Sequence, residues 1–329
     1  MNLEPWQREV NVALGVVREG AALARDIRQR LGGHALLKAD RSPVTVADFS
    51  VQALVAHRLG QAFPDDPLVA EEDSASLQRP DARPTLQSVL DVLHRAVPDL
   101  PGDQVLEAID RGRGMPGQRF WTLDPVDGTQ GFVRGDQYVV ALALIVGGRV
   151  EIGLLGCPAL SLGDARRDAV GTIVYAVRNR GAFGGSLGRD EFEPLRVSSR
   201  REPRLARVLR SFESDHIDIK TFNETIRTLG IEAAPTLMDS QAKHAVIAAG
   251  QADLLIRLPA TPEFRDKIWD QAAGSLIIEE AGGRVTDVRG NSLDFGTGRM
   301  LVRNEGVIAS NGHLHAAVLD VFRSATGSS

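Results

Sequence analysis

Acidic side chains follow apolar runs in this sequence, at positions where solvated surface acids are not expected. Asp124 comes directly after the run Phe120–Leu123, and Asp127 lies three residues later within the stretch DPVDGT. Glu71 ends a shorter apolar run. The Pro and Gly of DPVDGT would hold its carboxylates within one turn, and like charges held that close are stabilised by a cation.

Further acids stand near the expected beginnings of helices. Asp48 falls in the first turn of a predicted helix, and Asp270 opens an apolar helix where negative charge suits the N-terminus. Oxygen donors from separate segments, with no cluster of Cys or His, suit Mg²⁺ better than zinc. Paired cations roughly 3.5 to 4 Å apart commonly hydrolyse phosphate esters. From the residues alone, the alternative stays open that DPVDGT is only a turn with a side-chain cap.

The elements that would position these acids follow from apolar spacing. Helices are predicted over 5–31, from Thr45 to Pro64, and over 85–97, 220–229, 240–249, 269–281 and from 313 onward. Strands are predicted over 68–70, 120–123, 138–146, 150–155, 172–177, 206–209, 254–258, 285–288 and 307–309, with Gly147 and Gly148 turning a hairpin. The segment 98–118 is rich in Pro and Gly, and the stretch GRGMPG at 112–117 within it is interpreted as a flexible loop. The pattern predicts helices and sheets packed in layers. The first half of the chain is predicted to be rich in antiparallel strands, and in the second half strands are predicted to alternate with helices. We expect an α+β subdomain over 1–200 and an α/β subdomain over 201–329.

Composition restricts the class of protein. The 329 residues correspond to about two domains or one large one at roughly 150 residues per domain. With 43% hydrophobic and 25% charged residues and a mean hydropathy of -0.11, the chain is typical of globular proteins rather than disordered or fibrous ones. A net charge of -5 and a pI of about 5.9 argue against nucleic acid or an anionic membrane as partner.

The remaining sequence features indicate a cytoplasmic protein. The single cysteine, Cys157, cannot form an intramolecular disulfide or build a metal centre alone. The first residues show neither the basic nor the apolar region of a signal peptide. The longest apolar run, Tyr138–Val146, is far shorter than the roughly 20 residues that a membrane span needs.

Several motifs together resemble a known family. DPVDGT at 124–129 resembles the DPxDGT signature of the lithium-sensitive, magnesium-dependent phosphomonoesterases related to inositol monophosphatase. WDQAAG at 269–274, followed by EAGG at 280–283, resembles their second signature, and AEEDS at 70–74 resembles their GEES segment with Ala70 replacing glycine. The resemblance implies the α/β class, as a layered α-β-α-β-α sandwich of the sugar-phosphatase type.

Within that superfamily the chain is most similar to the 3′(2′),5′-bisphosphate nucleotidases. The similarity lies in SPVT at 42–45, GFVRGDQ at 131–137, DSQAK at 239–243, RLP at 257–259 and LDFG at 293–296. Inositol monophosphatases usually carry a more neutral segment in place of 240–243. A nucleotide with two phosphates needs positive charge beyond the metals, which Lys243 and Arg257 would supply at the 5′-phosphate.

The resemblance implies a role for each matching residue. Asp48 and Thr129 would hold and deprotonate the attacking water. The ligands for two or three Mg²⁺ would be Glu71, Asp124, the Val126 carbonyl, Asp127 and Asp270. Substrate contacts would come from Gly128, Thr129, His216, Ser240, Lys243, Arg257 and Asp270. For His216 the alternative is a solvated surface histidine.

The implied activity is removal of the 3′-phosphate from adenosine 3′,5′-bisphosphate, giving AMP and phosphate, by water attack without a covalent intermediate. The family also implies activity on the corresponding phosphosulfate, lithium sensitivity and a place in sulfur assimilation. The partner would be a small-molecule nucleotide. Two alternatives remain: an inositol monophosphatase-like or broader sugar phosphatase, and a catalytically silent nucleotide-binding sensor.

Overall fold

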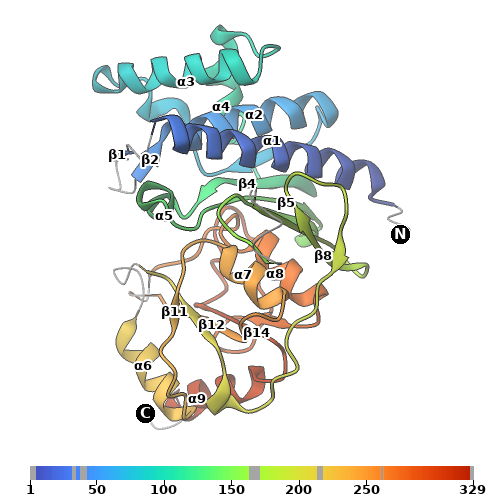
Figure 1. Ribbon diagram of the computed structural model, residues 1–329, viewed down its shortest axis with the longest axis vertical. Coiled ribbons are helices and arrows are strands. Elements are labelled where there is room, and N and C mark those ends of the chain that lie inside the picture. Colours follow the sequence, from blue (N-terminus) through green and yellow to red (C-terminus); the bar gives the residue numbers. More distant parts are fainter. Residues whose placement is uncertain are drawn as a thin grey trace.

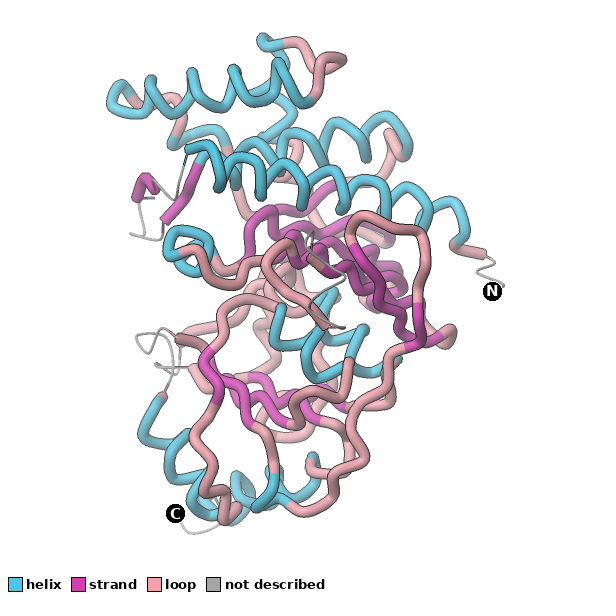
Figure 2. The backbone as a smooth tube through the Cα atoms, in the orientation of Figure 1, coloured by secondary structure: helices cyan, strands magenta, loops and turns pink. Residues whose placement is uncertain are grey.

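Helices and sheets alternate in five layers along the long axis of the molecule. The computed structural model describes residues 5–31, 35–37, 43–162, 171–212, 218–259, 261 and 263–326. Figure 1 shows helices, a first sheet, a second group of helices, a second sheet and a last pair of helices, and Figure 2 shows the two groups of strands separated by helix. This arrangement confirms the predicted α-β-α-β-α sandwich.

The first layer contains α1 (Gln7–Leu31), α2 (Val46–Ala62), α3 (Arg83–Ala96) and α4 (Val105–Asp110). Apolar residues of α1 recur at helical spacing and form one buried face. Helix α2 is buried on all sides over residues 47–56, between α1, its neighbouring helices and the first sheet. At the start of α2, Thr45 and Asp48 form a capping box. The cap explains both why the helix begins there and why the Asp48 side chain is directed back toward the chain entering it.

The first sheet has seven strands in the order β3-β4-β5-β6-β7-β8-β9. Only the β3–β4 pair is parallel. Gly147 and Gly148 join β5 to β6 with φ angles of 57° and 75°, values that glycine adopts readily. The strands are β3 (Leu68–Ala70), β4 (Arg119–Asp127), β5 (Val139–Val146), β6 (Arg149–Cys157), β7 (Thr172–Val177), β8 (Gly181–Ser186) and β9 (Glu193–Pro194).

The central helices α7 (Ala242–Ala248) and α8 (Ala272–Glu280) lie between the two sheets. Both are buried, and they share one apolar cluster with strands of both sheets. Gly153 of β6 permits the closest approach, because a Cβ there would lie 2.7 Å from the Ala273 carbonyl oxygen. These helices are therefore fixed against the first sheet although they come late in the chain.

The second sheet has five strands in the order β11-β10-β12-β14-β13. Its outer face is covered by α6 (Ile219–Thr228) and α9 (His315–Thr326), which bury a third apolar cluster. The strands are β10 (Val208–Arg210), β11 (Thr236–Leu237), β12 (Leu254–Arg257), β13 (Arg284–Thr286) and β14 (Val307–Ser310). The division of the chain near residue 200 stays a prediction, because α7 and α8 pack against both sheets.

Short elements complete the described chain. A small antiparallel pair, β1 (Ala35–Leu37) and β2 (Pro43–Thr45), precedes α2, and α5 (Thr129–Arg134) follows β4. Helix α4, which we did not predict, forms within the Pro- and Gly-rich segment 98–118 and buries Val105 and Ile109 on one side. Single 3₁₀ turns occur at Ser74–Ser76, Pro80–Ala82, Gly102–Gln104 and Pro203–Leu205. Among the described helices, none combines the length and the apolar character needed to cross a bilayer.

Candidate active site

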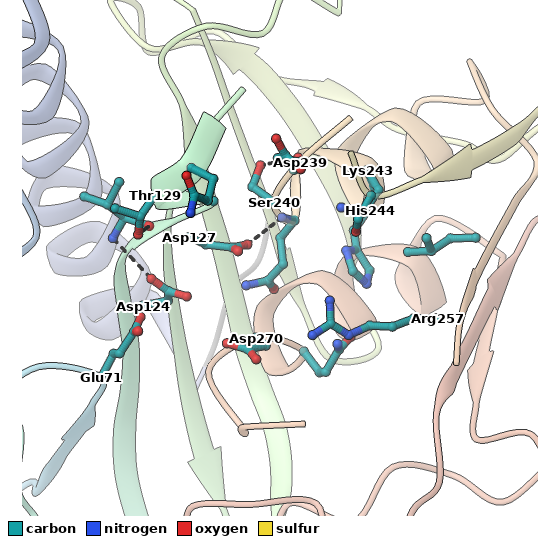
Figure 3. Close-up of a pocket in the computed structure, with 17 residues that line it drawn as sticks. Glu71, Asp124, Asp127, Thr129, Asp239, Ser240, Lys243, His244, Arg257 and Asp270 are labelled. Carbon is teal, nitrogen blue, oxygen red and sulfur yellow. Dashed lines mark hydrogen bonds between the residues drawn. The ribbon is translucent and has the colours of Figure 1, made fainter. Parts of the chain in front are cut away.

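A pocket of about 250 Å³ opens between the end of β4 and the start of α7. Figure 3 shows Glu71 and Asp124 on one side of it and Lys243 and Arg257 on the other. Its lining includes ten of the predicted site residues: Glu71, Asp124, Val126, Asp127, Gly128, Thr129, Ser240, Lys243, Arg257 and Asp270. Asp48 lies behind Thr129. The predicted contact His216 lies outside the described residues.

Strand pairing brings the first two carboxylates together. β3 and β4 run parallel with Ala70 opposite Leu123, so Glu71 and Asp124 follow at the same end of neighbouring strands. The Glu71 N–H donates to the Leu123 carbonyl at 3.3 Å. This pairing accounts for the convergence of residues that are far apart in the sequence.

The DPVD stretch belongs to β4, which corrects the expectation that the strand ends at residue 123. Asp124 pairs with Ala141 and Asp127 with Val139, and the register shifts between them as in a bulge. The Val126 N–H donates to Asp124 Oδ1 at 3.2 Å. The bulge thus directs both carboxylates and the intervening backbone toward the pocket.

Gly128 allows the end of β4 to approach the turn before α7. Its φ is 86°, in the left-handed region, and a Cβ there would lie 2.9 Å from the Cβ of Ser240. Ser240 itself has a φ of 64°. Its hydroxyl donates to the Asp239 carbonyl at 2.6 Å and accepts from the Ala242 N–H at 3.2 Å. The helix after Ser240 begins at Ala242, two residues later than predicted.

Thr129 and Asp48, predicted to share the attacking water, contact each other. The Thr129 hydroxyl lies 3.2 Å from Asp48 Oδ1 and 3.1 Å from the Val126 carbonyl oxygen. Asp48 is fully buried, and its Oδ2 accepts bonds from the Thr45 N–H at 2.7 Å and the Thr45 hydroxyl at 2.6 Å. The helix cap therefore fixes the carboxylate that faces Thr129.

Burial and like charge act together on the carboxylates. The pKa of Asp124 is raised well above its usual value by burial and by the charges of Glu71 and Asp127, among others. Burial raises the pKa of Asp270 as well, against the opposing effect of Arg257. Burial also raises the pKa of Asp127, while Lys243 and the Gln241 N–H oppose it. The cluster therefore holds its negative charge only at a free-energy cost that a cation would offset.

The donor set fits a hard divalent cation. Its side chains offer carboxylate oxygens, and Val126 can add a carbonyl oxygen. The described lining of the pocket also contains one imidazole, that of His244, which lies on the opposite wall near Lys243 and Arg257. No three acidic, His or Cys side chains in the described ranges are already drawn into one coordination cluster. Because like charges repel, the cation itself would have to draw these oxygens together.

The opposite wall carries positive charge. Lys243 is buried, and its Nζ donates to the Met238 carbonyl at 3.0 Å. Burial lowers the pKa of Lys243 to about 8, although Asp127 favours the charged form. Arg257 is part-buried and donates from Nε to Asp266 Oδ1 at 2.6 Å. The two cations thus lie in one pocket with the acids.

Gln241 joins the two walls, and we did not predict a role for it. Its backbone N–H donates to Asp127 Oδ2 at 2.5 Å. Its carboxamide donates to the Trp269 carbonyl at 2.9 Å and accepts from the Gly274 N–H at 3.0 Å. It lies within the DSQAK stretch, and that position is the signal that could have indicated it. Asp270 lies in the chain between Trp269 and Gly274, the two residues that the Gln241 side chain bonds. It precedes the start of α8, whereas we predicted it inside the helix.

Arg299 makes a second link across the site. One Nη donates to the Ala70 carbonyl, the other donates to the Gly112 carbonyl at 3.2 Å, and the guanidinium lies 4.8 Å from the centre of the Trp269 ring. Nothing in a single sequence indicates this role.

Buried carboxylates face cations across one pocket, an arrangement whose charges suit metal ions on one wall and an anion on the other. The chain matches the model of the inositol monophosphatase family over residues 6–326, and it belongs to that family. Members of the family are metal-dependent phosphatases.

Curated proteins with similar sequences align with this chain over almost its whole length. A 3′(2′),5′-bisphosphate nucleotidase of Schizosaccharomyces pombe is 38% identical, covering 98% of this chain and 96% of its own. One from Oryza sativa is 37% identical, covering 98% of this chain and 95% of its own.

Among solved structures, the Thermotoga maritima IMPase has a TM-score of 0.69 at 22% identity, covering 97% of this chain and 98% of its own. Mycobacterium tuberculosis SuhB has a TM-score of 0.62 at 23% identity, covering 98% of both chains. These likenesses agree with the layered fold.

Proposed function

We propose that this protein is a Mg²⁺-dependent 3′(2′),5′-bisphosphate nucleotidase that converts adenosine 3′,5′-bisphosphate to AMP and phosphate. The observation that carries the proposal is the pair Lys243 and Arg257 on the wall opposite the carboxylates. Arg257 pairs with Asp266 through Nε, and a second substrate phosphate could bind the remaining N–H donors of the two cations. The names of the similar nucleotidases support the same substrate.

The carboxylate wall would hold the metal ions, two or three in number. Their ligands would be Glu71, Asp124, Asp127, Asp270 and the carbonyl of Val126. Bound Mg²⁺ supplies positive charge to the reacting phosphate and lowers the pKa of water. The bulge in β4 and the β3–β4 pairing fix the backbone from which Glu71, Asp124 and Asp127 extend, so that only side chains would have to move to bind a cation.

Asp48 and Thr129 would prepare the attacking water. The Thr129 hydroxyl, between Asp48 and the Val126 carbonyl, can accept the proton of a water molecule while donating its own to Asp48 Oδ1. Water would then attack the 3′-phosphorus in line, and the leaving ribose oxygen would take up a proton. No side chain becomes covalently attached to the phosphate.

The cation wall would bind the second phosphate. Lys243 and Arg257 can each donate to its oxygens, and Ser240 lies beside them at the turn that leads into α7. Gly128 and Asp270 would contact the substrate from the carboxylate side. This division assigns chemistry to one wall and selection of the nucleotide to the other.

The first experiment compares two substrates with purified protein and Mg²⁺. Phosphate release from adenosine 3′,5′-bisphosphate should be far faster than from inositol 1-phosphate, and mass spectrometry should identify 5′-AMP. Lys243→Met should reduce the ratio of the two rates. Equal or reversed wild-type rates would favour an inositol monophosphatase-like or broader sugar phosphatase. Inactivity on both substrates would favour a nucleotide-binding sensor.

A further inference from the structure

His244 is buried in the wall of the pocket, and its ring nitrogens make no hydrogen bond of normal geometry to the described protein. The residue is 3% exposed, and neither ring nitrogen makes a hydrogen bond of normal geometry among the described residues. The side chain of Gln271, whose Oε1 likewise makes no hydrogen bond of normal geometry there, is the neighbouring protein group that interacts with the ring. Each buried polar atom left without a partner costs free energy, so native proteins retain few of them.

A second buried histidine has both of its ring nitrogens hydrogen-bonded within the protein. His315, at the start of α9, is 1% exposed, and both ring nitrogens are paired, one with the Thr286 hydroxyl at 2.8 Å and one with the Ser310 hydroxyl at 2.9 Å. His315 is thus satisfied by the fold. His244 differs from it in facing the pocket, where a ligand can supply the missing partner.

The His244 ring is held in place. A Cβ on Gly274 of α8 would lie 2.5 Å from the His244 Cγ, so the ring packs directly on that glycine. In Figure 3 the ring lies between the side chains of Lys243 and Arg257. Burial, assisted by these two cations, lowers the pKa of His244 to about 3. The imidazole is therefore neutral near pH 7, with one N–H to donate and one lone pair to accept.

We propose that His244 donates a hydrogen bond to the second, 5′-phosphate of the substrate, between the charged contacts from Lys243 and Arg257. The inference rests on the proposed function and adds a neutral hydrogen-bond donor to the proposed binding site for the second phosphate. A positively charged side chain at position 244 would repel both Lys243 and Arg257. A neutral N–H adds a bond to the phosphate without adding charge. His244 would thereby favour ligands that carry a phosphate at this position.

The test compares His244→Leu with His315→Leu in the full-length protein. For His244→Leu, we expect the ratio of kcat/KM for adenosine 3′,5′-bisphosphate to that for adenosine 3′-phosphate to fall about tenfold, the scale of one hydrogen bond to a charged group. The metal-free melting temperature should not fall, because an unpartnered polar ring is replaced by an apolar side chain. His315→Leu should give the reverse: a lower melting temperature and an unaltered ratio.

Binding of 5′-AMP separates failure of this inference from failure of the proposed function. Wild-type protein should melt at a higher temperature with 5′-AMP than with adenosine, and His244→Leu should lose most of that difference. If the wild type binds 5′-AMP but hydrolyses no bisphosphate, the proposed function fails and the His244 contact stands. An unaltered 5′-AMP shift, or an equal fall of kcat/KM on both substrates, in His244→Leu would overturn the contact alone. His244→Gln, which keeps an N–H donor, should recover part of the ratio.

Discussion

The guanidinium of Arg299 lies over the ring of Trp269, 4.8 Å from its centre, while the same side chain donates to the carbonyl of Ala70. Trp269 precedes Asp270, and Ala70 precedes Glu71. One side chain therefore sets the spacing of two pocket carboxylates that come from distant parts of the chain.

Arg299→Lys should weaken the response to Mg²⁺. Lysine lacks the planar fork that reaches two carbonyls while stacking on an indole. We expect the Mg²⁺ concentration for half-maximal activity to rise about tenfold and the free energy of unfolding to fall by about 1–3 kcal/mol, as for lost buried hydrogen bonds. Phosphate release at graded Mg²⁺ and urea unfolding measure the two effects.

Arg303→Lys is the matched control. Arg303 is exposed and pairs with Asp294 at 2.9 Å in the same region of the chain. Its replacement should change the free energy of unfolding by less than about 0.5 kcal/mol. An Arg299→Lys protein with wild-type Mg²⁺ dependence would contradict the linking role.

Asp124→Asn should abolish phosphate release and yet stabilise the metal-free protein. Burial and neighbouring acids raise the pKa of Asp124, so its charge opposes folding above that pKa. Asparagine removes the charge and keeps an oxygen to accept the Val126 N–H. We expect a higher melting temperature without metal and a smaller rise on adding Mg²⁺. A lower metal-free melting temperature with the full Mg²⁺ response would assign Asp124 a structural role.

Activity on the nucleotide should decline above about pH 8. Burial lowers the pKa of Lys243 to about 8, so its positive charge is present below that pH and lost as the pH rises through it. The profile of kcat/KM against pH reports groups of the free enzyme. We expect a downward bend near pH 8 in the wild type and none in Lys243→Met, whose kcat/KM should be low throughout. A bend that persists in Lys243→Met would mean that another group titrates.

Gln241→Leu should destabilise the protein by about 2–4 kcal/mol, because the Trp269 carbonyl and the Gly274 N–H would both lose their partner. Chemical denaturation measures the change. Gln87→Leu is the control, since Gln87 is exposed and bonds only Asp91 among the contacts that its side chain makes. If the two variants had the same free energy of unfolding, the bonds of Gln241 would not be important for stability.

Much of the framework follows from patterns that survive in a single sequence. The long helix α1 is amphipathic over many turns, the start of α2 is marked by its capping box, and the hairpin of β5 and β6 is marked by paired glycines. DPVDGT locates Asp124, Asp127 and Thr129 because its residue types are unusual after an apolar run. In each case the side chains themselves carry the signal.

The rest depends on backbone atoms that residue types do not reveal. Pro125 suggests the end of a strand, yet β4 continues because the proline lies in the register shift between Asp124 and Asp127. Gln241 and Arg299 act through carbonyl and N–H groups of remote segments, which any residue could present. Helix α4 has only six residues, too few for a clear period.

The bond from the Gln241 N–H to Asp127 has a consequence for biosynthesis. Asp127 lies on the first sheet, and the ribosome makes Gln241 only 114 residues later. Asp270 and Arg299 are made later still. A chain interrupted before these residues would contain the complete DPVDGT motif but no enclosed pocket, so premature termination should leave an inert fragment rather than a slow enzyme.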